Sequence, residues 1–312
     1  MPDSHIPRVG LQRAGIVAGF LVLWFGLFSY IMNGPVGRDE NMYIPAGILA
    51  GSGSIYADFA YLQMPYLPML YGSVFKLTGT SHYLLWGRLL SFGFMAVSSL
   101  LVYFISRRLS GSRLVASCMV ALFGFNSVLI RTSGYAWNSV MPIPFALAAF
   151  LLFLPGTSGQ AKPICILFSG VLVSLAIGTK LLYAVMAPAF LVTALLHPGG
   201  CSPGSGKDGR DGARSSGFRQ RVTCVLVPLL LGMTMGMLPV LVCLLRDFDR
   251  FIFYNVTYHR LNTLWYQLQG VTDTMTIGSR VLYARGLLAE PSNMALAIGL
   301  MFFVLATNTK RQ

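Results

Sequence analysis

The chain has 312 residues, of which 55% are hydrophobic and only 11% charged, and its formal net charge is +13. Soluble domains carry about 25% charged residues, and a soluble fold of this size could not cover its surface with so few polar groups. Disorder is excluded as well, because it requires low hydrophobicity. The apolar runs are long and unbroken, unlike the roughly ten-residue alternating segments of a membrane barrel. The sequence therefore predicts an all-α, polytopic transmembrane helical bundle.

Apolar segments recur along the whole chain. A spanning helix needs about 20 predominantly apolar residues, and eight segments are candidates. They are Ala14–Met32, Tyr83–Ile105, Leu114–Ile130, Val140–Leu154, Pro163–Gly178, Leu181–Leu196, Val222–Leu245 and Asn293–Thr307. The first is predicted to be an anchor rather than a signal peptide, because its apolar run is long and no small-x-small cleavage site follows it.

The basic residues predict the orientation. Lys and Arg concentrate in cytoplasmic loops, and a cytoplasmic N-terminus places more than half of the 23 basic residues on that side, including those of the short turn 106–113. The excess of positive charge therefore reports topology, and nucleic acid is not an expected partner. We expect an integral protein of the plasma (inner) membrane whose active face is outside.

Three parts are expected in the chain. Residues 1–196 form an N-terminal transmembrane module with a first outer loop at 33–82, and residues 222–312 form C-terminal spans with a second long outer loop at 246–290. Residues 197–221 between them are rich in Gly, Ser and basic residues, which is typical of a flexible cytoplasmic linker. Most of the ten acidic residues lie in the two outer segments: Asp39, Glu40, Asp58, Asp247, Asp249, Asp273 and Glu290.

The first outer loop begins with an acidic pair. Asp39 and Glu40 precede the segment Asn41–Ala50, whose apolar residues recur at helical spacing and predict a short amphipathic helix on the membrane surface. Asp39 would then be the N-cap, with Glu40 in the first turn. Alternatively, the pair is functional, since a carboxylate can accept a proton from a hydroxyl group or bind a metal ion.

Several motifs of this loop occur in a characteristic order. Arg38–Tyr43 (RDENMY) is followed by Gly53–Phe59 (GSIYADF), Gln63–Tyr71 (QMPYLPMLY) and Gly87–Ser91 (GRLLS). This series resembles the start of membrane glycosyltransferases of the GT-C superfamily, such as the dolichyl-phosphate-mannose protein mannosyltransferases and the lipid A aminoarabinose transferases. Weaker resemblances follow at 170–180, which ends in Thr-Lys, and at 253–259.

The resemblance implies a function and roles for the acids. Such enzymes transfer a sugar from a polyprenyl-phosphate donor to a lipid, glycan or protein acceptor at the non-cytoplasmic face. Asp39 matches the acid that serves as general base or metal ligand, and Glu40 would support it or share a divalent metal ion. Attack from the face opposite the phosphate would invert the anomeric centre.

A cationic partner for the donor phosphate is also expected. Arg88 matches the motif R-L-x-S, although it could equally be an interfacial residue whose charge reaches water. Lys180 lies between two apolar runs, where an ionisable residue is costly and suggests a function, or else it occupies a tight outer turn. His259 and Arg260 are further candidates that could simply be solvated.

Four residues are candidates for contacts with the acceptor or the sugar: Tyr43, Asp58, Trp137 and Asn138. Asn138 stands where relatives usually carry another Asp, and an amide cannot act as a base. This departure and the length of the chain leave two alternatives open: a lipid transporter or flippase, and a non-catalytic, truncated relative.

Overall fold

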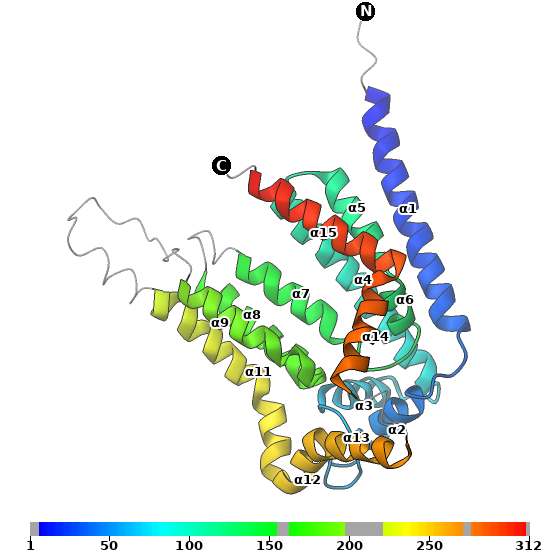
Figure 1. Ribbon diagram of the computed structural model, residues 1–312, viewed down its shortest axis with the longest axis vertical. Coiled ribbons are helices and arrows are strands. Elements are labelled where there is room, and N and C mark those ends of the chain that lie inside the picture. Colours follow the sequence, from blue (N-terminus) through cyan, green and yellow to red (C-terminus); the bar gives the residue numbers. More distant parts are fainter. Residues whose placement is uncertain (1–5, 155–161, 197–220, 271–275, 310–312) are drawn as a thin grey trace, which may run out of the picture.

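The computed structural model describes residues 6–154, 162–196, 221–270 and 276–309, which are almost entirely helical (Figure 1). The helices are α1 (Ile6–Asn33), α2 (Glu40–Ala50), α3 (Tyr66–Thr78), α4 (Tyr83–Ser110), α5 (Arg113–Gly124), α6 (Ser127–Ser133), α7 (Pro142–Phe153), α8 (Pro163–Thr179), η2 (Leu181–Val185), α9 (Met186–Leu196), η3 (Val222–Leu226), α11 (Val227–Arg246), α12 (Phe248–Ile252), η4 (Phe253–Thr257), α13 (Tyr258–Leu268), α14 (Ile277–Ala289) and α15 (Pro291–Thr309). Within the described ranges, β-structure is limited to one isolated bridge between Ile55 and Phe59.

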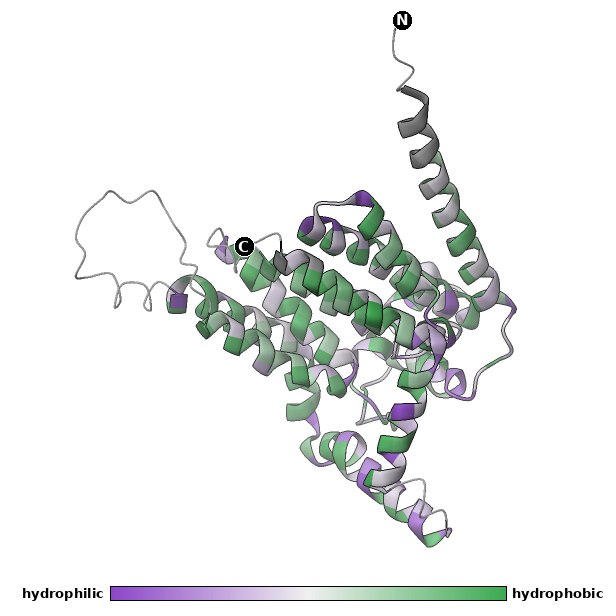
Figure 2. Cartoon of the chain, turned by 45° about the horizontal axis from the view of Figure 1, so that its top comes forward, coloured by the Kyte–Doolittle hydropathy of each residue, from purple (hydrophilic) through white to green (hydrophobic). Residues whose placement is uncertain are grey.

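The apolar helices confirm the helical membrane class. By length and composition, α4 and the continuous helix Val222–Arg246 can each cross a membrane, and the bent pairs α5–α6 and α14–α15 raise the number to four if each pair is one span. Apolar residues cover most of the bundle helices, whereas polar residues gather near their ends (Figure 2). The other apolar stretches, among them Val17–Asn33 of α1, are 10–17 residues long and fall short of this length. The expected total of eight spans therefore stays a prediction.

One expected span is broken by a capping residue, and another is preceded by a sharp bend. The helix predicted over 114–130 bends by 61° between α5 and α6. Asn126 lies at the break, and its side chain accepts a hydrogen bond from the backbone N–H of Leu129, so it caps a new helix. The predicted span at 293–307 forms the greater part of α15, which meets α14 at an angle of 77°.

Helices α8 and α11 pack against each other at very short range. A Cβ atom added to Gly232 would lie 1.9 Å from the carbonyl oxygen of Leu167, and one added to Gly170 would lie 2.2 Å from that of Leu229. Only glycine permits such close approach of two backbones. This contact fixes the end of α8, where Lys180 is located.

The first outer loop contains two packed helices. The amphipathic segment predicted at 41–50 is helix α2, which buries Tyr43, Ile44, Ala46 and Gly47. Gly47 lies directly against Tyr71 of α3. The buried face of α2 is therefore covered by protein, and its position on a membrane surface stays a prediction.

The second outer segment covers part of the first. The Arg250 guanidinium donates a hydrogen bond to the carbonyl of Ala57, and Arg246 donates to the Ser54 hydroxyl at 3.1 Å. Between them Tyr56 is buried and stacks on Tyr254, with ring centroids 6.2 Å apart. Tyr56 has a φ of 72°, which is unusual for an aromatic residue, so its surroundings must hold it there. The predicted linker, apart from Arg221, lies outside the described residues, and the three-part division stays a prediction.

Replacing Gly232 with Leu should destabilise the bundle. The new side chain would collide with backbone atoms of α8, and overpacking of this kind costs about 1–3 kcal/mol or more. Thermal unfolding of the purified protein in detergent measures the effect. Gly93→Leu on α4 is the control, because a Cβ atom at Gly93 meets nothing within 4 Å. Equal melting temperatures of the two variants would contradict the close α8–α11 contact.

Candidate functional site

A buried ion pair lies at the start of the site. Glu40 is 1% exposed and its partner Arg88 only 5%. Glu40 Oε1 accepts a hydrogen bond from Arg88 Nε at 3.0 Å, and Glu40 Oε2 accepts one from Nη2 at 2.9 Å. The backbone N–H groups of Ala136 and Gly37 donate to the same two oxygens, at 2.9 and 2.7 Å. The carboxylate therefore joins α2, α4 and two loops.

The remaining donors of Arg88 hold the end of α1. Its Nη1 donates to the carbonyls of Ile31 and Gly34 at 3.1 and 2.8 Å, and Nη2 donates to that of Pro35 at 2.9 Å. These carbonyls belong to the last turn of α1 and the following loop, which would otherwise leave them unpaired. Arg88 is thus directed toward protein atoms.

The pair holds Glu40 in its ionised form. Burial by itself would raise the pKa of Glu40, but the hydrogen bonds from Arg88, Gly37 and Ala136 outweigh it and lower the pKa below its ordinary value of 4.5. Both carboxylate oxygens of Glu40 are already engaged. Asp39 is therefore the acid of the pair whose carboxylate is left for other chemistry.

Asp39 precedes α2 without capping it through its side chain. The residue adopts helical backbone angles and makes no side-chain cap hydrogen bond to α2, whereas its carbonyl accepts bonds from the backbone N–H groups of Met42 and Tyr43. Its carboxylate is partly exposed and acts electrostatically on both Tyr43 and Lys180. Asp39 occupies the predicted N-cap position and Glu40 the first turn, but the side chain of Asp39 makes no capping hydrogen bond.

Lys180 lies at the junction of α8 and η2. Its backbone is extended, and its Nζ donates a hydrogen bond to the Ser139 hydroxyl at 2.8 Å. Burial lowers the pKa of Lys180, and the negative charge of Asp39 opposes that shift. An ammonium group and a carboxylate from distant parts of the sequence therefore share one electrostatic environment.

The segment 135–139 connects the ion pair with Lys180. Ala136 donates to Glu40 and Ser139 accepts from Lys180, while Asn138 between them is 2% exposed and donates to Gln63 Oε1 at 3.2 Å. Trp137 packs against the hydrophobic core, and its Nε1 is buried without a hydrogen-bond partner among the described residues.

Two tyrosines, Tyr43 and Tyr61, pack against each other, and Tyr43 lies close to Asp39. Tyr43 is 4% exposed and packs edge to face against Tyr61, with ring centroids 6.2 Å apart. The Tyr61 hydroxyl is fully buried and has no hydrogen-bond partner within the described ranges. The charge of Asp39 raises the pKa of Tyr43 further, beyond the larger effect of burial.

The other sequence candidates, Asp58, His259 and Arg260, are exposed. Asp58 is exposed, and its Oδ2 accepts a hydrogen bond from the backbone N–H of Ser54 at 2.6 Å, which stabilises a turn. His259 Nε2 lies 3.1 Å from the carbonyl oxygen of Leu62, and Arg260 is exposed. In this structure Asp58 and His259 support the loop, and their roles toward substrate remain predictions.

The structure adds residues that sequence reasoning did not single out. Gln63 and Ser139 are the direct partners of Asn138 and Lys180, and both are polar residues within or next to the quoted motifs. The Glu40–Arg88 pairing had a sequence signal, because a charge that enters an apolar environment needs a partner. Among the described residues, no group of three or more His, Cys, Asp or Glu side chains is placed to hold a metal ion.

Residues 55–197 match the model of a protein family described as dolichyl-phosphate-mannose-protein mannosyltransferase. None of the curated proteins and none of the solved structures gives a significant match to the chain. The resemblance predicted from the motifs is confirmed over these residues, which carry a glycosyltransferase domain of this family. The match supports a membrane glycosyltransferase that uses a lipid-linked sugar donor. Arg88, Asn138 and Lys180 lie inside the matched segment, whereas Asp39 and Glu40 precede it.

Breaking the buried ion pair should strongly destabilise the fold. Glu40→Gln leaves the buried guanidinium without its carboxylate, which costs about 3–5 kcal/mol in comparable pairs. Arg88→Lys keeps the charge but loses the two-pronged contact with Glu40 and most hydrogen bonds to the end of α1. Melting temperatures of the purified variants measure this loss. Arg131→Lys is the control, since the Arg131–Glu290 pair is solvent-exposed and exposed pairs contribute about 0–1 kcal/mol. A wild-type-like Glu40→Gln variant would contradict the assigned role.

The Glu40–Arg88 pair should make the stability of the fold depend on pH. The folded-state pKa of Glu40 is below 4.5, so the pair stabilises fully above that pH, and its contribution is lost as the pH falls through the lower, folded pKa. Unfolding followed from pH 6 downward in about half-unit steps measures this loss. In Glu40→Gln the acid-dependent part should be smaller, and equal slopes in both proteins would assign the acid sensitivity to other groups.

Proposed function

We propose that the protein transfers a sugar from a polyprenyl-phosphate donor to an acceptor hydroxyl at the non-cytoplasmic face of the membrane, with inversion at the anomeric carbon. One observation carries the proposal: the side chain of Asp39 does not cap the helix, and its carboxylate acts electrostatically on the partly buried ammonium of Lys180. A base and a cation are the minimum parts that this reaction requires.

The reaction follows from these two groups. Asp39 accepts the proton of the acceptor hydroxyl as its oxygen attacks the anomeric carbon. The bond between this carbon and the phosphate oxygen breaks at the same time, and polyprenyl phosphate leaves with the bonding electrons. Lys180 stabilises the negative charge that develops on the departing phosphate, and attack opposite to the leaving group inverts the configuration.

The buried ion pair has a positioning role in this proposal. Arg88 is directed toward Glu40 and the carbonyls that end α1, and Glu40 is bonded to both neighbouring loops. The pair therefore fixes the backbone from which the Asp39 carboxylate extends, and a displacement of about 1 Å in a catalytic group can cost about 100-fold in rate. We assign the phosphate contact to Lys180 rather than to Arg88.

The environment of the acceptor and sugar is formed by Tyr43, Trp137 and Asn138. Asn138 is held by Gln63 and can offer an amide hydrogen bond to a sugar hydroxyl, but it cannot act as a second base. The proposal consequently rests on one general base. The family description names mannose on dolichyl phosphate, so polyprenyl-phosphate mannose is the first donor to test, followed by glucose and aminoarabinose derivatives.

Replacing Asp39 with Asn should abolish most of the transfer. Loss of a general base lowers rates by about 10²–10⁴-fold, while the amide preserves shape and the helix start. The measurement is transfer from tritiated polyprenyl-phosphate sugars to membrane acceptors by protein in nanodiscs, with the anomeric configuration of the product determined by NMR.

Asp249→Asn is the matched control, because Asp249 is an exposed acid on α12. The control should retain wild-type activity. If Asp39→Asn also retains it, Asp39 is not the base; if the wild type releases sugar with retained configuration, the proposed direct displacement is wrong.

Lys180 should affect donor use. Lys180→Gln removes the cation while keeping a polar side chain, so we expect a higher KM for the lipid-linked donor and a lower kcat. Lys180→Arg should restore part of both values, because it returns the charge. Lys76→Gln on α3 is the control, since Lys76 is exposed. Unchanged kinetics in Lys180→Gln would remove this residue from the site.

A further inference from the structure

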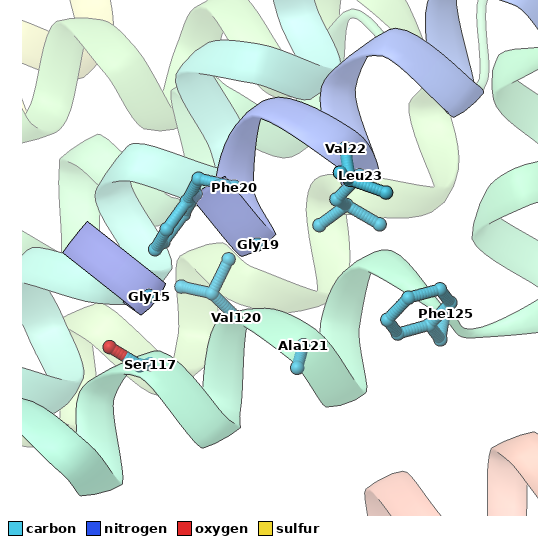
Figure 3. A pocket seen from close by; sticks show the side chains of 9 residues that line it. All are labelled: Gly15, Gly19, Phe20, Val22, Leu23, Ser117, Val120, Ala121 and Phe125. Atoms are coloured by element: carbon cyan, nitrogen blue, oxygen red, sulfur yellow. The ribbon is translucent and has the colours of Figure 1, made fainter. Parts of the chain in front are cut away.

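An apolar groove runs between α1 and α5, away from the candidate site. It consists of two adjoining cavities of about 390 and 300 Å³, which share Val22, Leu23 and Phe125 as lining residues. Figure 3 shows the first cavity, with Phe20 and Leu23 of α1 facing Val120 of α5 and Phe125, the residue after α5. Apart from the Ser117 hydroxyl and Tyr30, the described lining side chains of both cavities are apolar or glycine.

The groove exists because α1 presents glycine toward it. Gly15, Gly19 and Gly26 line the two cavities, and a Cβ atom added to any of them would meet nothing within 4 Å. The two helices touch where Leu23 reaches Gly124, at which an added Cβ atom would lie 2.7 Å from the leucine side chain. α1 is therefore held against α5 at a restricted place and leaves open space beside it.

Neither cavity is large enough to enclose a helix. An α-helix with side chains is about 10–12 Å wide, so even ten residues of it, about 15 Å long, would occupy on the order of 1,200 Å³. The empty space of each cavity, about 790 and 640 Å³ including its open side, is smaller than this volume. An unbranched hydrocarbon chain is much thinner and can follow a groove of this kind.

The surface around the groove is the surface that a membrane protein exposes to lipid. Val17, Leu21, Val22 and Phe25 of α1 are exposed by 57 to 74%. The groove opens onto this apolar face, so its contents can exchange with the surrounding bilayer. An empty hollow would forfeit the dispersion contacts of its lining atoms, and bilayer lipid is the most concentrated source of hydrocarbon there.

We propose that the groove between α1 and α5 binds one acyl chain of a bilayer phospholipid. The acyl chain completes the packing of α1, whose last turn and following loop provide carbonyls to Arg88. Lipid in the groove would thus support the helix from which the first outer loop extends. This inference does not depend on the proposed sugar transfer.

Photo-crosslinking tests the proposal. The protein is reconstituted in nanodiscs of phosphatidylcholine that contain a small fraction of the same lipid with a diazirine on the acyl chain, and adducts are mapped by peptide mass spectrometry. We expect adducts to concentrate on 15–30 and 117–130, and Gly19→Leu, which fills the groove, to reduce them at least threefold. Uniform labelling of all apolar helices, or unchanged labelling in Gly19→Leu, would overturn the proposal.

Gly93→Leu on α4 is the matched control, because its new side chain also meets open space but lies outside the groove. It should leave labelling of the groove unchanged. The molecular mass of each variant is measured in parallel by light scattering. Two results together would show that a second copy of the protein covers this face: a changed oligomeric state of Gly19→Leu, and low labelling of the groove in the wild type. The lipid proposal would then be wrong.

Discussion

The ion pair between Glu40 and Arg88 is the interaction on which the rest of the structure depends. Both side chains are almost fully buried in a chain that has few charges, and each would be very costly there without the other. Their hydrogen bonds reach the end of α1, the start of α2 and the loop before α7. Charge is thus used inside the protein to fix how three chain segments meet.

A second constraint positions the cation. The glycine contacts between α8 and α11 bring these helices together at van der Waals distance, and α8 ends at Thr179, one residue before Lys180. The ammonium then reaches Ser139, two residues after the segment Tyr135–Trp137 that contacts Glu40. Glu40 and Lys180 thus both bind the short segment 136–139, one at each end.

This arrangement separates two acids that are adjacent in the sequence. Glu40 is buried, ionised and saturated with hydrogen bonds, whereas Asp39 is partly exposed and keeps its carboxylate outside the helix cap. Neighbouring carboxylates would repel each other if both were free, and the neutralisation of Glu40 by Arg88 relieves that repulsion. One acid therefore serves the fold, and the other stays available for a proton transfer.

The sequence by itself determined the class of the protein. Its hydropathy and scarcity of charge predicted a helical membrane protein, the order of motifs around Asp39, Tyr56 and Arg88 predicted the glycosyltransferase family, and the apolar spacing predicted helix α2. These properties depend on local pattern and composition, which the sequence contains directly. The bend at Asn126 had only a weak signal, because an Asn within an apolar run can be tolerated as well as capping a new helix.

Only the tertiary structure decided the partners of the charged residues. Arg88 matched a motif and was a candidate for the donor phosphate, but its partner lies 48 positions away in the sequence, and Lys180 and Ser139 are 41 apart. The sequence contains the charges but not the distances between them. Whether a buried cation is neutralised by protein or remains available to a ligand depends on those distances, since electrostatic interactions inside a protein act at short range and fall with separation.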